Sequence, residues 1–231
     1  SAGTVTANED TDYSGTLSAT DVDGDSLTYS VITTPSNGSL SLSSSSNSLS
    51  FDGTNDYVNM GNTSSLSIDG NVSISGWVKF SNFNNSLAAV MSIHSQTNGY
   101  AFEKTATANK LSFWVGDGSD DIEVTTNTLT ANTWYHVVGT NDGSTSKIYV
   151  NGSLVNSTSQ GNPSGPTGDF KIGINSNETT SSRYWNGNID EVAVWNDALT
   201  AAEVTALYNS GSGLSASSNS GDYTSSANLV G

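Results

Sequence analysis

The sequence predicts an all-β protein, an antiparallel sandwich with one short helix near its C-terminal end. Short runs of alternating apolar and polar residues, the pattern of half-buried strands, recur along most of the chain. The connections between these runs are rich in Gly, Asp and Asn, which favour tight turns. A helical spacing with capping residues occurs at 200–208. This combination is difficult to reconcile with an α/β architecture.

The composition excludes several classes of function. The 231 residues suffice for one good-sized core and carry a net charge of -16, so a basic face for nucleic acid is excluded. The chain has no cysteine and therefore no disulfide, thiolate nucleophile or cysteine-ligated metal. No apolar run approaches the ~20 residues that span a bilayer, so we expect no membrane insertion. Acidity and the lack of cysteine favour a secreted or cell-surface protein of bacterial origin.

Residues 1–46 are expected to form a small partial β segment that ends in the polar linker SSSSNS. A segment of about forty residues is too short for a sandwich of its own. Asp21, Asp23 and Asp25 are hard oxygen ligands at alternate positions, an arrangement that suits Ca²⁺. The alternative is a solvated β-turn, for which Asp and Gly are the commonest residues.

The main domain is expected over 47–211. Its first stretch, 49–60, predicts a strand, an Asp-Gly turn and a second strand, as in a hairpin. The strand-like runs that follow are Val72–Phe80, Leu87–His94, Tyr100–Lys104, Lys110–Val115, Ile122–Thr125, Trp134–Asn141, Lys147–Val150, Phe170–Ile174 and Trp185–Trp195. Tryptophans inside these runs are expected in the core rather than as sugar-stacking platforms. They are Trp77, Trp114, Trp134 and Trp195.

The helix is expected to begin after Thr200, an N-cap residue with Glu203 three residues later as the partner of a capping box. Leu199 and Val204 can form a hydrophobic staple across this start. A polar, Gly-rich stretch ends the helix. We expect 212–231 to be an extended or flexible linker or tail.

Five stretches of the main domain carry a family resemblance: LSFDGTNDYVNM, VSISGWVKF, NTWYHVVGTNDGSTSKIYVNGSLV, FKIGINSN and YWNGNIDEVAVWNDALTAAEVTALYNSG. In this order and spacing they resemble the laminin G-like, concanavalin A-like jelly-roll domain of bacterial secreted proteins. A second resemblance, to the front half of the cadherin-like repeats of large bacterial adhesins, is carried by ANEDTDYSGTLSATDVDGDSLTYSVITTPSNGSLSL. The first resemblance implies a jelly-roll sandwich, and the second implies Ca²⁺ near Asp21, Asp23 and Asp25.

A calcium site is predicted between the two ends of the main domain. The turn FDGTND offers Asp52, the Gly53 carbonyl and Asp56, and the strand start NIDE offers Asp190. Ca²⁺ takes roughly six to eight oxygen ligands, which a turn and a facing strand end can supply. The resemblance implies that these two segments lie side by side and that a structural ion joins them. The alternative is that Asp52 belongs to a simple hairpin turn and that Asp190 caps a strand.

Ligand-binding residues are expected on separate loops, at one rim or on the concave face of the sandwich. The resemblance implies this position, because relatives of the fold bind sugars or protein partners on rim loops or on the concave face. The predicted set is Asp117, Asp120, Asp121, His94, Asn98 and Tyr184. The alternative is that these loops are the ordinary polar surface of a β sandwich.

No motif of an established enzyme chemistry occurs in the sequence, and we predict that the chain is not an enzyme. The Glu-x-Asp-x-x-Glu string of glucanases with this jelly roll is absent, as are the serine-hydrolase elbow, the zinc-protease motif and a phosphate loop. The favoured hypothesis is a Ca²⁺-dependent recognition domain of a secreted or cell-surface bacterial adhesin, with a carbohydrate or cell-surface glycan as its ligand. Alternatives are a calcium-stiffened spacer between neighbouring modules of the same long chain, and an accessory module of a polysaccharide-degrading enzyme.

Overall fold

The computed structural model describes residues 48–95, 97–119, 121–176 and 183–231. The N-terminal segment lies outside these residues, and with it the predicted calcium ligands Asp21, Asp23 and Asp25. The predicted ligand-binding residue Asp120 also lies outside them. Within the described part of the chain, no helix has the length and apolar character needed to cross a membrane.

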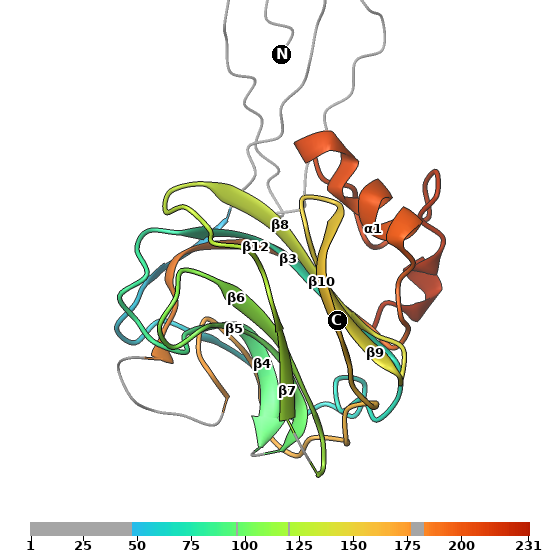
Figure 1. Ribbon diagram of the computed structural model, residues 1–231, viewed down its shortest axis with the longest axis horizontal. Helices are drawn as coiled ribbons and strands as arrows, with labels where there is room; N and C mark the ends of the chain where they lie inside the picture. The colour runs from blue at the N-terminus through green and yellow to red at the C-terminus, as the bar shows by residue number, and fades with distance from the viewer. Residues whose placement is uncertain (1–47, 96, 120, 177–182) are drawn as a thin grey trace, which may run out of the picture. The chain divides into compact units, whose positions relative to one another are not determined.

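Two six-stranded antiparallel sheets pack face to face as a sandwich (Figure 1). Sheet A has the order β1 (Leu49–Asp52), β12 (Asn186–Trp195), β3 (Val72–Phe80), β8 (Trp134–Asn141), β9 (Thr145–Val150) and β10 (Ser153–Ser159). Sheet B has the order β2 (Val58–Gly61), β11 (Phe170–Ile172), β4 (Ala89–Ser95), β5 (Asn98–Lys104), β6 (Leu111–Asp117) and β7 (Asp121–Thr125). Several neighbouring strands are far apart in the chain, as in a jelly roll. The predicted fold class is therefore confirmed.

The main core lies between the sheets and takes inward-facing residues from both of them. In β3, Ile74, Val78 and Phe80 are buried in this core, whereas Trp77 on the opposite face is partly exposed. The predicted runs 72–80 and 134–141 coincide with β3 and β8. In β3, the alternation therefore indicates which face of sheet A points to the core.

Strand β10 is absent from the predicted strands because its sequence, SLVNSTS, is polar and mostly exposed. It forms through the turn at Asn151 and Gly152, whose φ angles are 51° and 76°. Two consecutive residues with positive φ are typical of the tight turns that join antiparallel strands as a hairpin. Since β10 lies at the edge of sheet A, it needs no apolar face of its own.

The strand, turn and second strand predicted over 49–60 are confirmed as β1 and β2, but the two strands do not pair with each other as a hairpin. Strand β1 pairs with β12 in sheet A, and β2 pairs with β11 in sheet B, so the chain crosses from one sheet to the other. Phe51 explains the crossing, because this side chain is buried in the main core while the turn after it is exposed. Gly53, with a φ of 81°, lets the chain leave β1 at this point.

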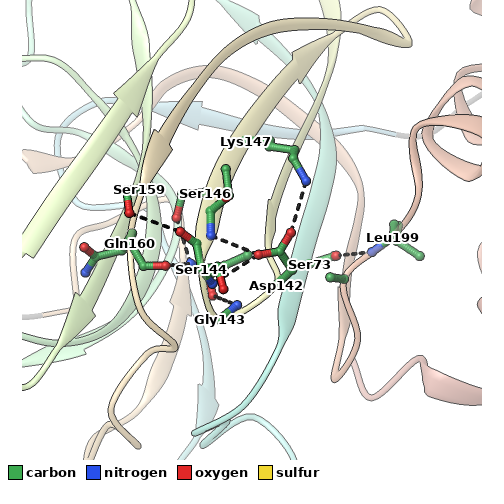
Figure 2. Close-up of polar contacts among 12 residues, drawn as sticks. Ser73, Asp142, Gly143, Ser144, Ser146, Lys147, Ser159, Gln160 and Leu199 are labelled. Carbon is green, nitrogen blue, oxygen red and sulfur yellow. Dashed lines mark hydrogen bonds and ion pairs between the residues drawn. The ribbon is translucent and has the colours of Figure 1, made fainter.

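Helix α1 (Ala201–Tyr208) begins with the predicted capping box. The Glu203 N–H donates to Thr200 Oγ1 at 3.3 Å, and the Thr200 N–H donates to Glu203 Oε2 at 2.9 Å. The segment before the helix is fixed to β3 by Ser73, whose hydroxyl accepts the Leu199 N–H at 2.9 Å (Figure 2). These contacts place the helix against the outer face of sheet A.

Residues 212–231 are not a linker, which corrects the prediction. They cover the outer face of sheet A together with α1 (Figure 1), follow a short 3-10 turn at Asn209–Gly211 and include a second one at Ser225–Asn228. Leu229 forms a β-bridge with Trp195, and the Trp195 Nε1–H donates to the hydroxyl of the fully buried Tyr223 at 2.8 Å. The second hydrophobic cluster formed in this way consists of Val138, Tyr149, Ala193, Trp195, Leu199, Val204, Leu207 and Tyr223.

The turn between β8 and β9 holds one of the two ion pairs found among the described residues (Figure 2). Asp142 Oδ1 accepts the N–H groups of Ser144 and Thr145 at 3.1 and 2.9 Å, and Oδ2 accepts Lys147 Nζ at 3.1 Å. Burial acts to raise the pKa of Asp142, but these donors outweigh it and lower the pKa. The carboxylate is thus engaged in holding its own hairpin.

Candidate functional site

The two ends of the main domain do lie side by side, as the calcium prediction required. Strands β1 and β12 are antiparallel neighbours, with Leu49 opposite Ile189. However, Asp52 pairs with Asn186, which places Asp190 four residues further along β12. At ~3.3 Å per residue this separation is about 13 Å along the strand. The prediction that Asp52 and Asp190 share one ion is therefore wrong.

Some oxygen atoms of the turn that follows β1 already accept hydrogen bonds from the protein. Asp52 Oδ1 accepts the Thr54 N–H at 2.7 Å, and Asp56 Oδ2 accepts the Asp52 N–H at 3.0 Å. The Gly53 carbonyl accepts Asn85 Nδ2 at 2.7 Å. Within the described part of the chain, no three His, Asp or Glu side chains come close enough to hold a metal. Each turn carboxylate keeps one oxygen without a hydrogen bond from a described residue.

Only part of the predicted rim set comes together. Asn98 and Asp117 are paired across β5 and β6, and His94 lies opposite the neighbouring Gly99. Asp121 opens β7 opposite Gly116 on the same edge of the strands. Tyr184 is elsewhere, with its ring 6.4 Å from the ring of Tyr57. The predicted set is therefore not one site.

His94 belongs to a buried polar cluster on the outer face of sheet B. Its Nε2 lies 2.9 Å from Glu103 Oε1, and both side chains are about nine-tenths buried, at 10% and 9% exposed. Asn175 Nδ2 donates to the same Glu103 oxygen at 2.6 Å, and the rings of His94 and Trp114 lie 4.7 Å apart. These contacts fix the segment after β11 onto the sheet, so the His94 side chain is engaged in packing.

A groove of about 200 Å³ lies on the outer face of sheet A, beside the C-terminal end of α1. It is lined by Trp77 of β3, Trp134 of β8, Asp190 and Glu191 of β12, and residues 211–213 of the C-terminal segment. The prediction that Trp77 and Trp134 belong to the core is wrong, because both lie on the outward face and are partly exposed. Trp114 and Trp195 are buried as predicted.

The two groove carboxylates are presented by a β-bulge in β12. The register against β3 shifts between Asp190 and Ala193, and Glu191 has a φ of 47°, which is unfavourable for a residue with a side chain. The Glu191 N–H donates to Asp190 Oδ1 at 2.9 Å. Burial, and then the charge of Asp190, raise the pKa of Glu191. Neither carboxylate has an ion-pair partner among the described residues.

The aromatic side of the groove is held by packing. Trp77 stacks on Tyr208 with ring centroids 5.9 Å apart and contacts the ring of His136 at 5.2 Å. Burial lowers the pKa of His136 to about 4, so this ring is neutral near pH 7. Trp134 is less constrained and carries the Lys79 ammonium at 5.1 Å from its ring centroid. The groove thus offers flat apolar faces beside hydrogen-bond acceptors, a combination suited to a ligand with both kinds of surface.

Solved structures of other proteins share this fold. Domain 4 of a GH43 extracellular arabinanase from Geobacillus stearothermophilus, in complex with arabinotriose, has 20% identity and a TM-score of 0.56 over 69% of this chain and 75% of that chain. The CBM40 of a Ruminococcus gnavus IT-sialidase, bound to α2,3 sialyllactose, has 16% identity and a TM-score of 0.55 over 71% of this chain and 95% of that chain. At such identities, the likeness concerns the fold alone.

A Bacteroides ovatus protein proposed to bind carbohydrate has 18% identity and a TM-score of 0.60 over 79% of this chain. The match covers 49% of that protein, about half of its length. No curated protein matches the sequence. The sequence profile of the concanavalin A-like lectin/glucanases superfamily matches residues 52–205, well over half of the 231 residues. The chain therefore belongs to the concanavalin A-like lectin/glucanases superfamily.

Proposed function

We propose that this chain is a non-catalytic carbohydrate-binding domain and that the groove on the outer face of sheet A is its binding site. The observation that carries the proposal is the convergence of Trp77, Trp134, Asp190 and Glu191 in one groove. A sugar ring has apolar C–H faces, which pack on aromatic rings, and hydroxyl groups, which donate to carboxylates. The carbohydrate complexes of the arabinanase domain and of the CBM40 support this reading, because both have the same fold.

The absence of catalysis is part of the proposal. Glycoside hydrolysis requires two carboxylates that flank the scissile bond about 5–10 Å apart. Asp190 and Glu191 are consecutive in one strand, and both line the groove. This arrangement suits the binding of hydroxyl groups better than acid–base chemistry on a glycosidic bond.

We place the domain in a secreted or cell-surface adhesin of bacterial origin. The resemblance of the N-terminal segment to cadherin-like repeats and the net charge of -16 support this setting. A spacer between modules, the alternative hypothesis, would have no need of a strained bulge that presents two unpaired carboxylates. The groove therefore favours recognition over a purely structural role.

Replacing Trp134 with alanine is expected to abolish or strongly weaken glycan binding, by at least about tenfold, because one stacking surface of the groove is lost. Trp134 is preferred to Trp77 because Trp77 also supports Tyr208 and His136. The measurement is an array of immobilised plant, bacterial and animal glycans, probed with both proteins. Tyr57→Ala is the matched control, since Tyr57 is 48% exposed and directly precedes β2 of sheet B, away from the groove-lining residues. Equal binding by wild type and Trp134→Ala would contradict the proposed site.

Calcium binding is a separate part of the proposal, and we place it at the turn 52–56. One free oxygen each on Asp52 and Asp56, with nearby backbone carbonyls, forms a set of hard donors. An ion there would stabilise the end of β1 beside β12. Saturating Ca²⁺ should contribute about 3 kcal/mol and so raise the melting temperature by roughly 6–12 °C.

The calcium prediction is checked by thermal melting with Ca²⁺, with Mg²⁺ and with a chelator. Asp56→Asn should remove the response to Ca²⁺, whereas Asp69→Asn, at an exposed carboxylate outside the turn, should keep it. Mg²⁺ should have little effect, because it demands a near-octahedral shell that this turn does not offer. Identical melting curves under all three conditions would rule out a stabilising ion at this turn.

A further inference from the structure

We infer that the groove selects sugars that carry a positive charge, namely amino sugars whose amine is not acetylated, over neutral sugars, and that it rejects uronic and sialic acids. This inference rests on the proposed function and concerns the ligand class of the same groove. It follows from the charges that line the groove, from its two aromatic rings and from its size.

The charges at the groove are predominantly negative. Asp190 and Glu191 line it, and neither has an ion-pair partner among the described residues. Lys79 is the nearby cation, and its ammonium lies over the Trp134 ring. His136, behind Trp77, is neutral near pH 7. An ammonium group on the ligand would supply the counter-charge that the two carboxylates lack, whereas a ligand carboxylate would be repelled.

The aromatic rings favour the same ligand class. A cation within about 6 Å of a tryptophan ring is attracted to its face, and Lys79 already occupies such a position at 5.1 Å from the Trp134 centroid. The ring is therefore placed where an ammonium group can reach it. Trp77, held by Tyr208 and His136, offers a second and more rigid surface. Together the rings can pack on the sugar while the carboxylates bind its amine.

The size of the groove limits how much of a glycan it holds. Its volume of about 200 Å³ is below the roughly 300–1,000 Å³ of pockets that enclose drug-sized ligands. One sugar ring therefore fits at a time, and the rest of an oligosaccharide extends into solvent. The net charge of -16 adds a long-range preference for cationic chains over anionic ones.

The test compares three oligosaccharides of equal length by calorimetry: a glucosamine hexamer, an N-acetylglucosamine hexamer and a galacturonate hexamer. At a pH just below neutral, the glucosamine hexamer should bind at least about tenfold more tightly than its acetylated counterpart, and this advantage should shrink with added salt. The galacturonate hexamer should not bind. Acetylation removes the charge and keeps the sugar backbone, so the first pair isolates the effect of the amine.

Three variants test whether the preference for the glucosamine hexamer arises at the groove. Glu191→Gln should weaken binding of the glucosamine hexamer severalfold more than binding of the acetylated hexamer, because it removes one charge from an exposed bulge. Lys79→Gln should increase the advantage, because it removes the competing cation from Trp134. Glu123→Gln, at an exposed carboxylate of sheet B, should change nothing. A response at Glu191 with none at Glu123 supports a local site.

The possible outcomes distinguish a failure of the charge preference from a failure of the proposed carbohydrate-binding function. If the glucosamine and N-acetylglucosamine hexamers bind equally well and Trp134→Ala abolishes the binding of both, the charge preference is overturned and the sugar site is kept. Binding of glucosamine that survives Trp134→Ala and weakens equally in Glu191→Gln and Glu123→Gln would reveal adsorption to an acidic surface and overturn the preference. A need for Ca²⁺ in binding neutral or acidic hexamers would show that the carboxylates hold an ion, which also overturns it. Failure of every glycan to bind would overturn the proposed function itself.

Discussion

Replacing Tyr223 with alanine is expected to lower the free energy of unfolding by about 4 kcal/mol, because it leaves a large cavity in a packed cluster. Tyr223 is fully buried, and its ring meets Trp195 edge-on with centroids 6.4 Å apart. Its hydroxyl accepts Trp195 Nε1–H at 2.8 Å and donates to the Ala216 carbonyl at 2.6 Å. The substitution therefore removes packing and also leaves a buried indole N–H without a partner.

Two matched variants divide this loss into its parts. Tyr223→Phe keeps the ring and removes the hydroxyl, so it should cost about 1–2 kcal/mol, the penalty for an unsatisfied buried donor. Tyr57→Ala removes an exposed tyrosine and should cost less than about 0.5 kcal/mol. The measurement is denaturant unfolding followed by tryptophan fluorescence. A cost for Tyr223→Ala as small as that for Tyr57→Ala would mean that the C-terminal segment does not pack on sheet A in solution.

The packing of this segment was beyond what the sequence could predict. Residues 212–231 are mostly polar and Gly-rich, which is typical of linkers. Their order depends on a few apolar residues, chiefly Tyr223 and Leu229, and on a receptive surface around Trp195. That surface exists only after sheet A and helix α1 have formed. A local pattern carries no signal for such a non-local contact.

The fold class and the helix cap were predictable because each depends on local patterns. Near-regular alternation marks β3, a run of aromatic and β-branched residues marks β8, and Thr200 with Glu203 forms the capping box within four residues. The neighbouring position of β1 and β12 was also expected, from the family resemblance. Their register was not, because it depends on main-chain pairing along the whole edge of sheet A. An ion shared by Asp52 and Asp190 required the register, and that part of the prediction is wrong.

The aromatic side of the groove could have been predicted from which residues of β3 and β8 share a face of the sheet. Val78 and Phe80 alternate on the core side of β3, which places Trp77 on the other face. In β8, Val137 lies in the core and Trp134 is three positions away, so it also faces outward. What the sequence does not contain is the bulge at Glu191, since a bulge depends on how β12 meets β3. The sequence therefore identified the two carboxylates as candidates, but it could not predict that they lie beside Trp77 and Trp134.

Replacing Glu203 with glutamine is expected to destabilise the domain by about 3 kcal/mol at neutral pH, because several hydrogen bonds to a charged group are weakened or lost. Oε2 accepts the N–H and hydroxyl of Thr200, and Oε1 accepts the N–H and hydroxyl of Thr224 and the hydroxyl of Ser225 at 2.6 Å. One carboxylate thus joins the start of α1 to the C-terminal segment. Because of this link, we expect Glu203→Gln to destabilise helix α1 and the C-terminal segment together.

The same carboxylate predicts how stability depends on pH. Burial acts to raise the pKa of Glu203, but the hydrogen bonds from Ser225, Thr200 and Thr224 outweigh it and lower the pKa to about 2. A lowered pKa in the folded state means that the stabilisation is complete above the unfolded value of 4.5 and is lost as the pH falls from 4.5 towards 2.

The gap in unfolding free energy between wild type and Glu203→Gln should therefore be constant near neutral pH and should close below pH 4.5. Glu123→Gln, at an exposed carboxylate, should show no such dependence. A gap that persists undiminished to about pH 2 would mean that Glu203 acts through its shape rather than its charge. In that case packing around Trp195 and Tyr223 would hold the C-terminal segment against α1. Tyr223→Ala, and not Glu203→Gln, would then be the variant that detaches the segment.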